Sequence, residues 1–380
     1  MNGTKGRLFS GAGFGFFHTI LMAFSITVPV FYFSSLEISI VTYGFLLTIG
    51  DFFSFLLKPY LGYLTDKYGE RRFLLGCTFL FFITLFLLGF TDSIPMILFL
   101  KIISSMASAF LFILIIIYGL RNVSKKPDKK VGTFGAIKNS GWILGLLIPG
   151  LIIDSFGINT AFYLIFIIGF ILFYFTYKLT QKFKDSPNIK VKASFTFIRK
   201  IPLLIILKTM DLAVFTAFLF FFTRFAIHSL GLGSGIVSII VVFETLFFVI
   251  TNYLVGIISN KAKRKYWVPA CIISHLVGII VVLNASTLHQ YFLGSILFGV
   301  AGGFIDVWLF SRISESVEIY DKGFFYGTFG WSYDFATIVG GLIPVIFVSL
   351  GLNQFGSMFV FPIFMMITYL LSTSYKIVSK

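Results

Sequence analysis

The sequence predicts an all-α membrane protein with twelve transmembrane helices, arranged as two parallel-repeat bundles of six. Two observations carry this prediction. Hydrophobic residues make up 58% of the 380 residues and charged residues only 12%, whereas a soluble protein has roughly a quarter charged residues. In addition, one motif occurs twice in the chain, 195 residues apart. The mean hydropathy of +0.98 agrees with a chain that lies largely in the bilayer.

The repeated motif occupies residues 132–149 and 327–344, and nine of its eighteen positions are identical. Its offset is close to half of the chain, which indicates that one fold unit was duplicated head to tail. Parallel repeats in membrane proteins form two bundles that rock about a site between them. We therefore divide the chain into an N-terminal bundle (1–180), a cytoplasmic linker (181–200) and a C-terminal bundle (201–380).

Each predicted helix is an apolar stretch of about 20 residues, long enough to cross ~30 Å of hydrocarbon. In chain order the predicted spans are 10–33, 38–61, 73–91, 95–120, 131–154, 158–179, 202–228, 233–258, 267–287, 290–314, 325–350 and 355–376.

The basic residues segregate to one side of this twelve-helix arrangement. Of the 30 Lys and Arg residues, 26 fall at the two termini, in the linker and in loops on one side. The opposite loops carry only Glu37, Asp92, Asp154 and His289. By the positive-inside rule both termini are cytoplasmic, in a protein of the plasma membrane. Topology thus explains the net charge of +15 without a nucleic-acid partner.

The loop after the second helix carries a specific motif, GYLTDKYGERR at residues 62–72. It resembles the loop 2–3 signature of the major facilitator superfamily. The positions that match the signature are Gly62, Leu64, Asp66, Lys67, Gly69, Arg71 and Arg72. A decayed copy follows 194 residues later, at 256–261, with Asn260 in place of the acid.

This resemblance implies a secondary transporter, most like the proton-coupled drug and metabolite antiporters of the superfamily. It also implies that Asp66 contacts the start of the eleventh helix, near residues 325–327, so that the loop acts as a cytoplasmic gate. The segment 141–164 resembles the Gly/Pro-rich fifth helix of the antiporters, and 101–107 is similar to a proton-coupling motif with Lys101 in place of Arg.

Small residues in the repeat predict close helix packing and tilting, because they let backbones approach. In the two copies these are Gly132, Gly145, Pro149, Gly327, Gly340 and Pro344.

Ionisable residues at bilayer depth cost roughly 2.5–3.5 kcal/mol each, so each needs a role. Asp51 and Glu244 have no basic residue within one helical turn. We expect at least one of them to carry protons or to bind a cationic substrate. Lys208 lies three residues before Asp211, on the same helix face, which favours an ion pair.

The other candidates for the coupling site or substrate cavity are Lys101, Lys138, Asn139, Arg224, Asp306, Tyr333 and Asp334. The two copies of the repeat differ at one polar pair: Lys138-Asn139 in the first copy aligns with Tyr333-Asp334 in the second. This difference predicts an asymmetric cavity. Lys58 is expected to extend its amine to the cytoplasmic surface, and Lys101 and Arg224 either do the same on the outer side or form ion pairs.

No metal or cofactor site is evident from sequence. Cys77 and Cys271 lie in equivalent apolar stretches and read as buried small residues. His18, His228, His275 and His289 are scattered over different predicted helices without ligand spacing. No phosphate-binding loop is present, so ATP does not drive the protein directly.

The sequence thus predicts a monomeric secondary transporter of a small organic or amphipathic solute, exported in exchange for protons by alternating access. A proton symporter and an organic-anion exchanger that uses Lys138, Lys208 or Arg224 are the alternatives. A membrane-embedded enzyme would need a polar catalytic cluster at the interface, which the sequence lacks, and a transporter-like receptor or channel is the remaining class. The bilayer, protons and a small molecule are the expected partners, and fold alone does not identify the solute.

Overall fold

The computed structural model describes residues 2–36, 38–68, 70–120, 127–181, 202–258, 266–316 and 330–374. The helices of the first half are α1 (Asn2–Ser35), α2 (Ile40–Tyr68), α3 (Glu70–Leu88), α4 (Ile94–Leu120), α5 (Pro127–Phe156) and α6 (Ile158–Thr180). Those of the second half are α7 (Pro202–Ala217), α8 (Thr223–His228), α9 (Ser234–Ile258), α10 (Trp267–Leu283), α11 (Leu288–Ser316), α13 (Trp331–Ser349) and α14 (Val360–Ser374).

Each of the twelve predicted spans is mostly helical over its described residues, which confirms the predicted fold class. One span is split: a π-helical turn at Phe218–Phe222 joins α7 to α8. Another has a short 3₁₀ turn, Gly356–Phe359, before α14. In the described ranges, nine helices are long and apolar enough to cross a membrane and three shorter ones are apolar. Residues 182–200 of the predicted linker (181–200) lie outside the described residues.

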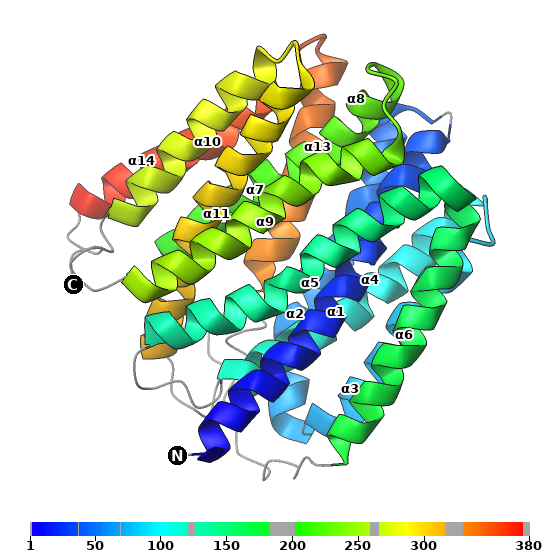
Figure 1. Cartoon of the computed structure of the whole chain (residues 1–380), viewed down its shortest axis with the longest axis vertical. Coiled ribbons are helices and arrows are strands. Elements are labelled where there is room, and N and C mark those ends of the chain that lie inside the picture. The colour runs from blue at the N-terminus through cyan, green and yellow to red at the C-terminus, as the bar shows by residue number, and fades with distance from the viewer. Residues whose placement is uncertain are drawn as a thin grey trace.

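The two halves repeat the same packing. In the first half α1 packs on α5, and α3 packs on both α4 and α6. In the second half α7 packs on α13, and α10 packs on both α11 and α14. Between the halves α5 lies along α9, and the equivalent pair α13 and α2 forms the other contact (Figure 1). The turns repeat as well, since Gly157 and Gly351 end α5 and α13 with φ of 82° and 75°, a backbone region that favours glycine.

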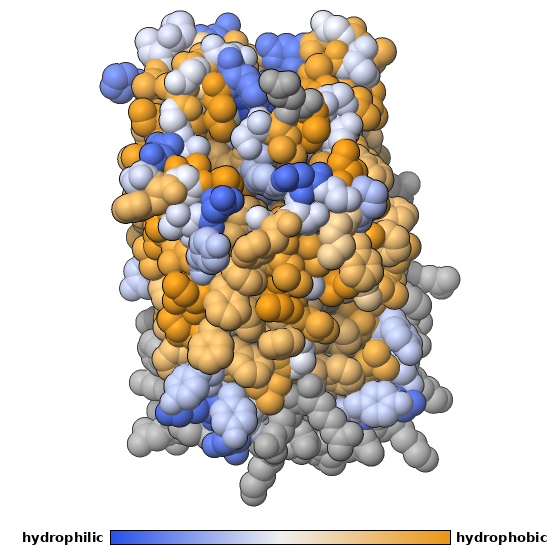
Figure 2. All heavy atoms as spheres, turned by 90° about the vertical axis from the view of Figure 1, so that its right-hand side faces the viewer, coloured by the Kyte–Doolittle hydropathy of each residue, from blue (hydrophilic) through white to orange (hydrophobic). Residues whose placement is uncertain are grey.

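The start of α1 and the end of α14 lie at the same end of the bundle (Figure 1). We call this end the terminal face, and the end with the turns at Gly157, Gly231 and Gly351 the distal face. On the side that Figure 2 shows, the middle and lower part of the outer surface is mostly apolar, whereas hydrophilic residues gather toward the upper end. On α2 the exposed side chains Val41, Phe45, Phe52 and Leu56 follow helical spacing and form one lipid-facing stripe.

Glycines of the repeat lie where helices touch. A methyl group at Gly145 of α5 would lie 2.6 Å from the Ile20 carbonyl oxygen of α1, and one at Gly340 of α13 would lie 2.7 Å from the Ala213 carbonyl oxygen of α7. The contact between the halves also repeats. Gly150 of α5 packs on Ser238 of α9. At the equivalent crossing of α2 and α13, a methyl group at Gly44 would lie 2.7 Å from the Val345 side chain. Each crossing therefore needs one residue without a side chain.

Replacing Gly145 with Ala should lower the free energy of unfolding by about 1–3 kcal/mol, because the methyl group overpacks the α1–α5 contact. Gly76→Ala on α3 is the matched control, since a methyl group there meets nothing within 4 Å. Ala is the better helix former, so the control should be neutral or stabilising. Thermal unfolding in detergent measures both variants, and equal effects would contradict the packing role.

Candidate functional site

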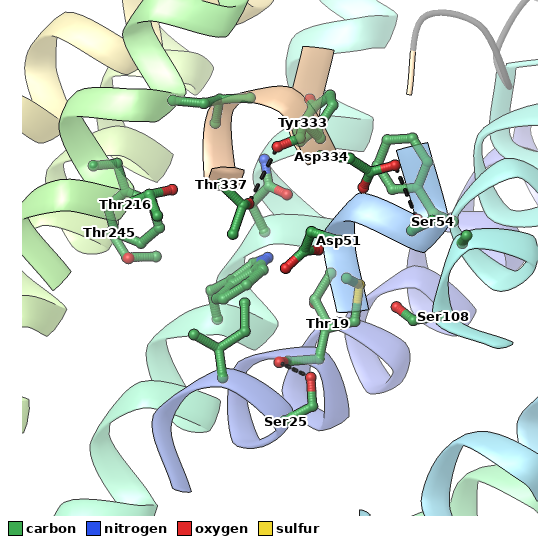
Figure 3. Close-up of a pocket in the computed structure, with 18 of the residues that line it drawn as sticks. Thr19, Ser25, Asp51, Ser54, Ser108, Thr216, Thr245, Tyr333, Asp334 and Thr337 are labelled. Atoms are coloured by element: carbon green, nitrogen blue, oxygen red, sulfur yellow. Dashed lines mark hydrogen bonds between the residues drawn. The ribbon is translucent and has the colours of Figure 1, made fainter. Parts of the chain in front are cut away.

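A cavity of about 200 Å³ lies between the two halves. Its wall is built from side chains of α1, α2, α3, α4 and α5 on one side and of α7, α9, α10, α11 and α13 on the other. Figure 3 shows polar groups from both halves around this space, including Asp51, Thr245 and Asp334. The charged residues of the wall are Asp51, Lys58, Lys101, Lys138, Lys208, Asp211, Glu244, Asp306 and Asp334.

Of the residues that sequence proposed for the cavity, all but Arg224 line it, Asn139 and Tyr333 included. Lys101 is only 6% exposed, so it does not extend outward as one expectation had it. Its helix, α4, packs closely against α2 because Gly50 of α2 has no side chain. A methyl group at Gly50 would lie 2.9 Å from the Lys101 carbonyl oxygen.

An ion pair joins the two halves on the terminal side of the cavity. Lys58 Nζ of α2 lies 2.6 Å from Asp334 Oδ1 of α13. Ser54 Oγ donates to Asp334 Oδ2 at 2.9 Å, and Lys58 Nζ also donates to the Gly330 carbonyl at 3.3 Å. The expectation that Lys58 reaches the aqueous surface is therefore wrong. A buried carboxylate from the other half holds the amine inside.

A second network lies within the C-terminal half. Lys208 Nζ is 2.9 Å from Asp211 Oδ2, which confirms the predicted pair, and 3.0 Å from Asp306 Oδ1 on α11. His275 Nε2 of α10 lies 3.0 Å from the other Asp211 oxygen, Oδ1. Asn252 of α9 donates to Asp306 Oδ2 at 3.5 Å. These contacts tie four helices of the half together around two carboxylates.

Asp51 and Glu244 remain outside these networks. Neither forms an ion pair with any residue that the structure describes. Glu244 accepts a hydrogen bond from the Thr245 hydroxyl at 2.8 Å. Asp51 interacts electrostatically with Lys101, Lys58 and Asp334 across the cavity. Each carboxyl group thus faces the cavity without a fixed counter-ion, which is what a group that exchanges protons with the cavity requires.

The polar residues of the repeat occupy equivalent places but differ in charge. Asn139 of α5 corresponds to Asp334, and Asn252 of α9 corresponds to Lys58. Both amide side chains lie beside Gly135. The α5–α9 interface therefore has two neutral amides at the positions where the α2–α13 interface has the Lys58–Asp334 ion pair. Lys138 next to Asn139 has no carboxylate within ion-pair distance in the described part of the chain, and its amine lies 5.9 Å from the Phe112 ring centre.

The distal side of the cavity is also closed by contacts between the halves. Arg224 of α8 donates to the Ile38 carbonyl at 2.9 Å and lies over the Tyr43 ring. The Tyr43 hydroxyl donates to the Phe220 carbonyl at 3.0 Å, in the π-helical turn. His228 Nε2 lies 2.8 Å from the Ser34 carbonyl oxygen. Arg224, predicted to be a cavity or outward-facing residue, is therefore part of an interface.

The proposed gate loop is described only in part. Gly62 is buried near the end of α2, and Lys67 is exposed and lies 5.0 Å from the centre of the Tyr68 ring. A hydrogen bond between Lys67 and Tyr68 raises the pKa of the lysine. Gly69 and Gly327 lie outside the described residues, as do the side chains of Asp66, Arg71 and Arg72 and the surroundings of Gly132. Pro149 and Pro344 lie within α5 and α13, and both are buried.

Two features escaped the sequence reasoning. The first is the partner of Lys58, which no local pattern predicts because Asp334 is 276 positions away. The second is the grouping of Cys271 and His275 with Asp211, whose ligand atoms lie within 4.8 Å of one another. The four-residue spacing of Cys271 and His275 on one helix was a signal that could have found it. The expectation that the two cysteines are buried is confirmed.

Comparison with known proteins identifies the family of this chain. The model of a family described as the Major Facilitator Superfamily matches residues 9–341. A segment of 130 residues is 25% identical to an uncharacterized MFS-type transporter, YuxJ, of Bacillus subtilis (strain 168), and covers 34% of this chain and 32% of that protein.

Solved structures share the fold over nearly the whole chain. The human organic anion transporter MFSD10 (TETRAN) aligns with a TM-score of 0.74 at 14% identity, over 98% of this chain and 100% of that one. A bacterial homologue of the iron transporter ferroportin, in an outward-facing state, aligns with a TM-score of 0.69 at 14% identity over 100% of both chains. The nucleoside transporter NupG aligns with a TM-score of 0.66 at 17% identity, over 97% of this chain and 99% of that one.

Proposed function

Since the chain belongs to the major facilitator superfamily, we propose that it is a secondary active transporter that moves a small organic or amphipathic solute through the central cavity by alternating access. The family and its structural neighbours point to a transporter and not to an enzyme. The observation that carries the proposal is a cavity walled by both repeats, with separable contacts between the halves on either side of it.

Alternating access requires that one set of these contacts break while the other forms. The terminal set is the ion pair of Lys58 with Asp334, supported by the bond from the Trp331 indole to the Phe55 carbonyl. The distal set contains Arg224 with the Ile38 carbonyl and Tyr43 with the Phe220 carbonyl. Each set combines a few polar bonds with aromatic contacts, Phe55 with Trp331 in the terminal set and Tyr43 with Phe221 in the distal set. Rocking of the halves about α5–α9 and α2–α13 can therefore exchange them. The loop with Asp66 would add to the terminal set.

The cavity size favours a small solute. Pockets for drug-sized ligands measure roughly 300–1,000 Å³, and this cavity measures about 200 Å³. A metabolite-sized molecule fits without displacement of the helices, whereas a larger amphipathic compound requires an opened state.

Proton coupling is assigned to Asp51 and Glu244. Burial penalises the charged form of a carboxylate that has no counter-ion, so a proton or a bound cation stabilises each group in the cavity. A cationic or hydrogen-bonding solute that enters the cavity then competes with that proton. Such competition is the basis of exchange. The segregation of basic residues supports a cytoplasmic terminal face, and export from the cytoplasm across the plasma membrane is the proposed direction.

Purified protein in liposomes tests this proposal. A pH gradient, acidic on the side that faces the distal loops, should drive accumulation of a solute that first raises the unfolding temperature of the protein. Counterflow of labelled solute should occur without a gradient. Saturable counterflow excludes a channel, and failure of every stabilising solute to exchange in counterflow would reject transport through this cavity.

A second candidate, exchange of organic anions, rests on Lys138. This amine lines the cavity and has no carboxylate partner among the described residues. Of the three basic residues proposed for this role, Lys208 is held by two aspartates and Arg224 lies at the distal interface.

Lys138→Gln should weaken binding of an anionic solute by about 1.5–3 kcal/mol, the value of a hydrogen bond to a charged group. The same change should leave the binding of neutral solutes nearly unaltered. Titration calorimetry with an anion and its neutral amide distinguishes the two. Equal affinities of the variant and the wild type for the anion would remove Lys138 from this role.

A further inference from the structure

The geometry points to a binding site for a divalent first-row transition-metal ion formed by Asp211, Cys271 and His275 at the edge of the cavity. The site is independent of the proposed solute transport. It combines one oxygen, one sulfur and one nitrogen ligand, contributed by α7 and α10. Cys271 and His275 are four residues apart on α10, so their side chains leave the helix on the same face.

The three ligand atoms are already close to the spacing that a metal ion imposes. Asp211 Oδ1 lies 3.0 Å from His275 Nε2 and 4.0 Å from Cys271 Sγ. Metal–ligand bonds of 2.0–2.3 Å in a tetrahedral site put ligand atoms roughly 3.3–3.8 Å apart. Asp211 Oδ1 therefore needs to shift by only a few tenths of an ångström. Cys271 Sγ and the His275 ring nitrogen, which lie within 4.8 Å of each other, have to approach by up to roughly 1 Å through side-chain rotation. Asp211 and His275 both line the cavity, which leaves the fourth position accessible from it.

The surroundings hold the ligands in position. Asp211 keeps its other oxygen, Oδ2, on Lys208 Nζ at 2.9 Å, so Oδ1 is available. Gly302 of α11 faces this oxygen, and a methyl group there would lie 3.6 Å from Oδ1. His275 is 1% exposed and its second nitrogen, Nδ1, has no hydrogen-bond partner. The described residues hold the imidazole by the contact with Asp211 and by packing beside the Phe298 ring, which keeps Nε2 directed at Asp211 Oδ1.

The donor set selects the class of metal. A thiolate and an imidazole favour Zn²⁺, Co²⁺ or Fe²⁺, whereas Mg²⁺ and Ca²⁺ require six or more oxygen ligands. On binding, Cys271 loses its thiol proton to solvent and the thiolate sulfur donates the electron pair to the metal. Lys208 is shared by Asp211 and Asp306, so these three groups carry one net negative charge. The thiolate adds a second, and together they match the two charges of the ion.

The first half lacks this set, which supplies a matched control. Gly145 of α5 contacts Ile20 of α1, and the equivalent Gly340 of α13 contacts Ala213 of α7. Ile20 and Ala213 are therefore equivalent, and so are the residues two positions before them, His18 and Asp211. Cys77 and Phe81 stand where the second half has Cys271 and His275. Cys77 is buried like Cys271 but has no third ligand near it in the described residues.

Titration of the purified, detergent-solubilised protein with Co²⁺ tests the site. We expect one equivalent to bind with a thiolate-to-cobalt charge-transfer absorption in the near ultraviolet, together with visible bands of tetrahedral cobalt. Zn²⁺ should displace the cobalt and remove the bands, and Mg²⁺ should not. Cys271→Ser and His275→Ala should lose the charge-transfer band or weaken cobalt binding at least tenfold, whereas Cys77→Ser should keep both.

Absence of the charge-transfer band in the wild-type protein would overturn the assignment without any variant. Persistence of the band in Cys271→Ser, or its loss in Cys77→Ser, would overturn it as well. The measurement needs neither solute nor gradient. A failed transport assay therefore leaves the metal-site proposal intact, and a failed cobalt titration leaves the transport proposal intact.

Discussion

Transport driven by a pH gradient should disappear when Asp51→Asn and Glu244→Gln are combined, while counterflow of the same solute continues. The two substitutions keep the shape of each side chain but remove its proton exchange. Coupling free energies of about 1–3 kcal/mol correspond to ~5–150-fold differences in affinity, so the gradient-driven accumulation ratio should fall by a factor in this range. Flux in liposomes with and without a gradient gives the ratio.

The single variants show which carboxyl group carries the coupling. Asp51 is near the ion pair on the terminal side, whereas Glu244 belongs to α9 and interacts with Lys208 and Asp211. Loss in only one single variant assigns the proton to that residue. Asp92→Asn in a distal loop is the control, because this carboxylate lies outside the cavity wall and accepts from the Tyr32 hydroxyl. Unchanged gradient-driven flux in the double variant would refute the assignment.

Lys58→Ala should strongly destabilise the protein. It leaves the Asp334 carboxylate, only 4% exposed, without a cation. Removal of one partner of a buried ion pair costs roughly 3–5 kcal/mol. Unfolding in detergent, followed by tryptophan fluorescence, measures the loss.

The pseudo-symmetric interface provides the control for this prediction. Asn252→Ala changes the equivalent position of α9, where no ion pair joins the halves among the described residues. It removes a 3.5 Å hydrogen bond to the Asp306 carboxylate and should cost at most about 1.5–3 kcal/mol, the range for a hydrogen bond to a charged group. Combining Lys58→Ala with Asp334→Ala removes both charges, so the double variant should be more stable than the sum of the single effects predicts. Equal losses in Lys58→Ala and Asn252→Ala would show that the ion pair does not hold the halves together.

Much of the fold and part of the cavity followed from sequence, for identifiable reasons. The twelve helices could be found because apolar length alone marks a membrane span. The pair of Lys208 with Asp211 could be predicted because both lie on one face of one helix. Most charged residues at bilayer depth could be placed in the interior, because a charge that faces lipid is too costly.

Contacts between distant segments could not be predicted in the same way. Lys58 sits one turn before the loop signature, and its flexible stem allows it either to reach water or to turn inward. Asp334, which decides between these, belongs to the other half. Arg224 similarly lies near a helix end, and only the approach of α2 brings the Ile38 carbonyl and the Tyr43 ring to it.

By itself, the sequence determined the membrane class, the twelve spans, the duplication and the inventory of buried charges. These depend on hydrophobicity and on spacing along one helix, both of which are local. Only the tertiary structure decided which charges neutralise each other, that Asp51 and Glu244 face the cavity without a counter-ion, and that Cys271 and His275 meet Asp211. The physical reason is that the desolvation cost of a charge depends on what lies within a few ångströms. In a two-bundle protein those neighbours come from helices hundreds of residues apart.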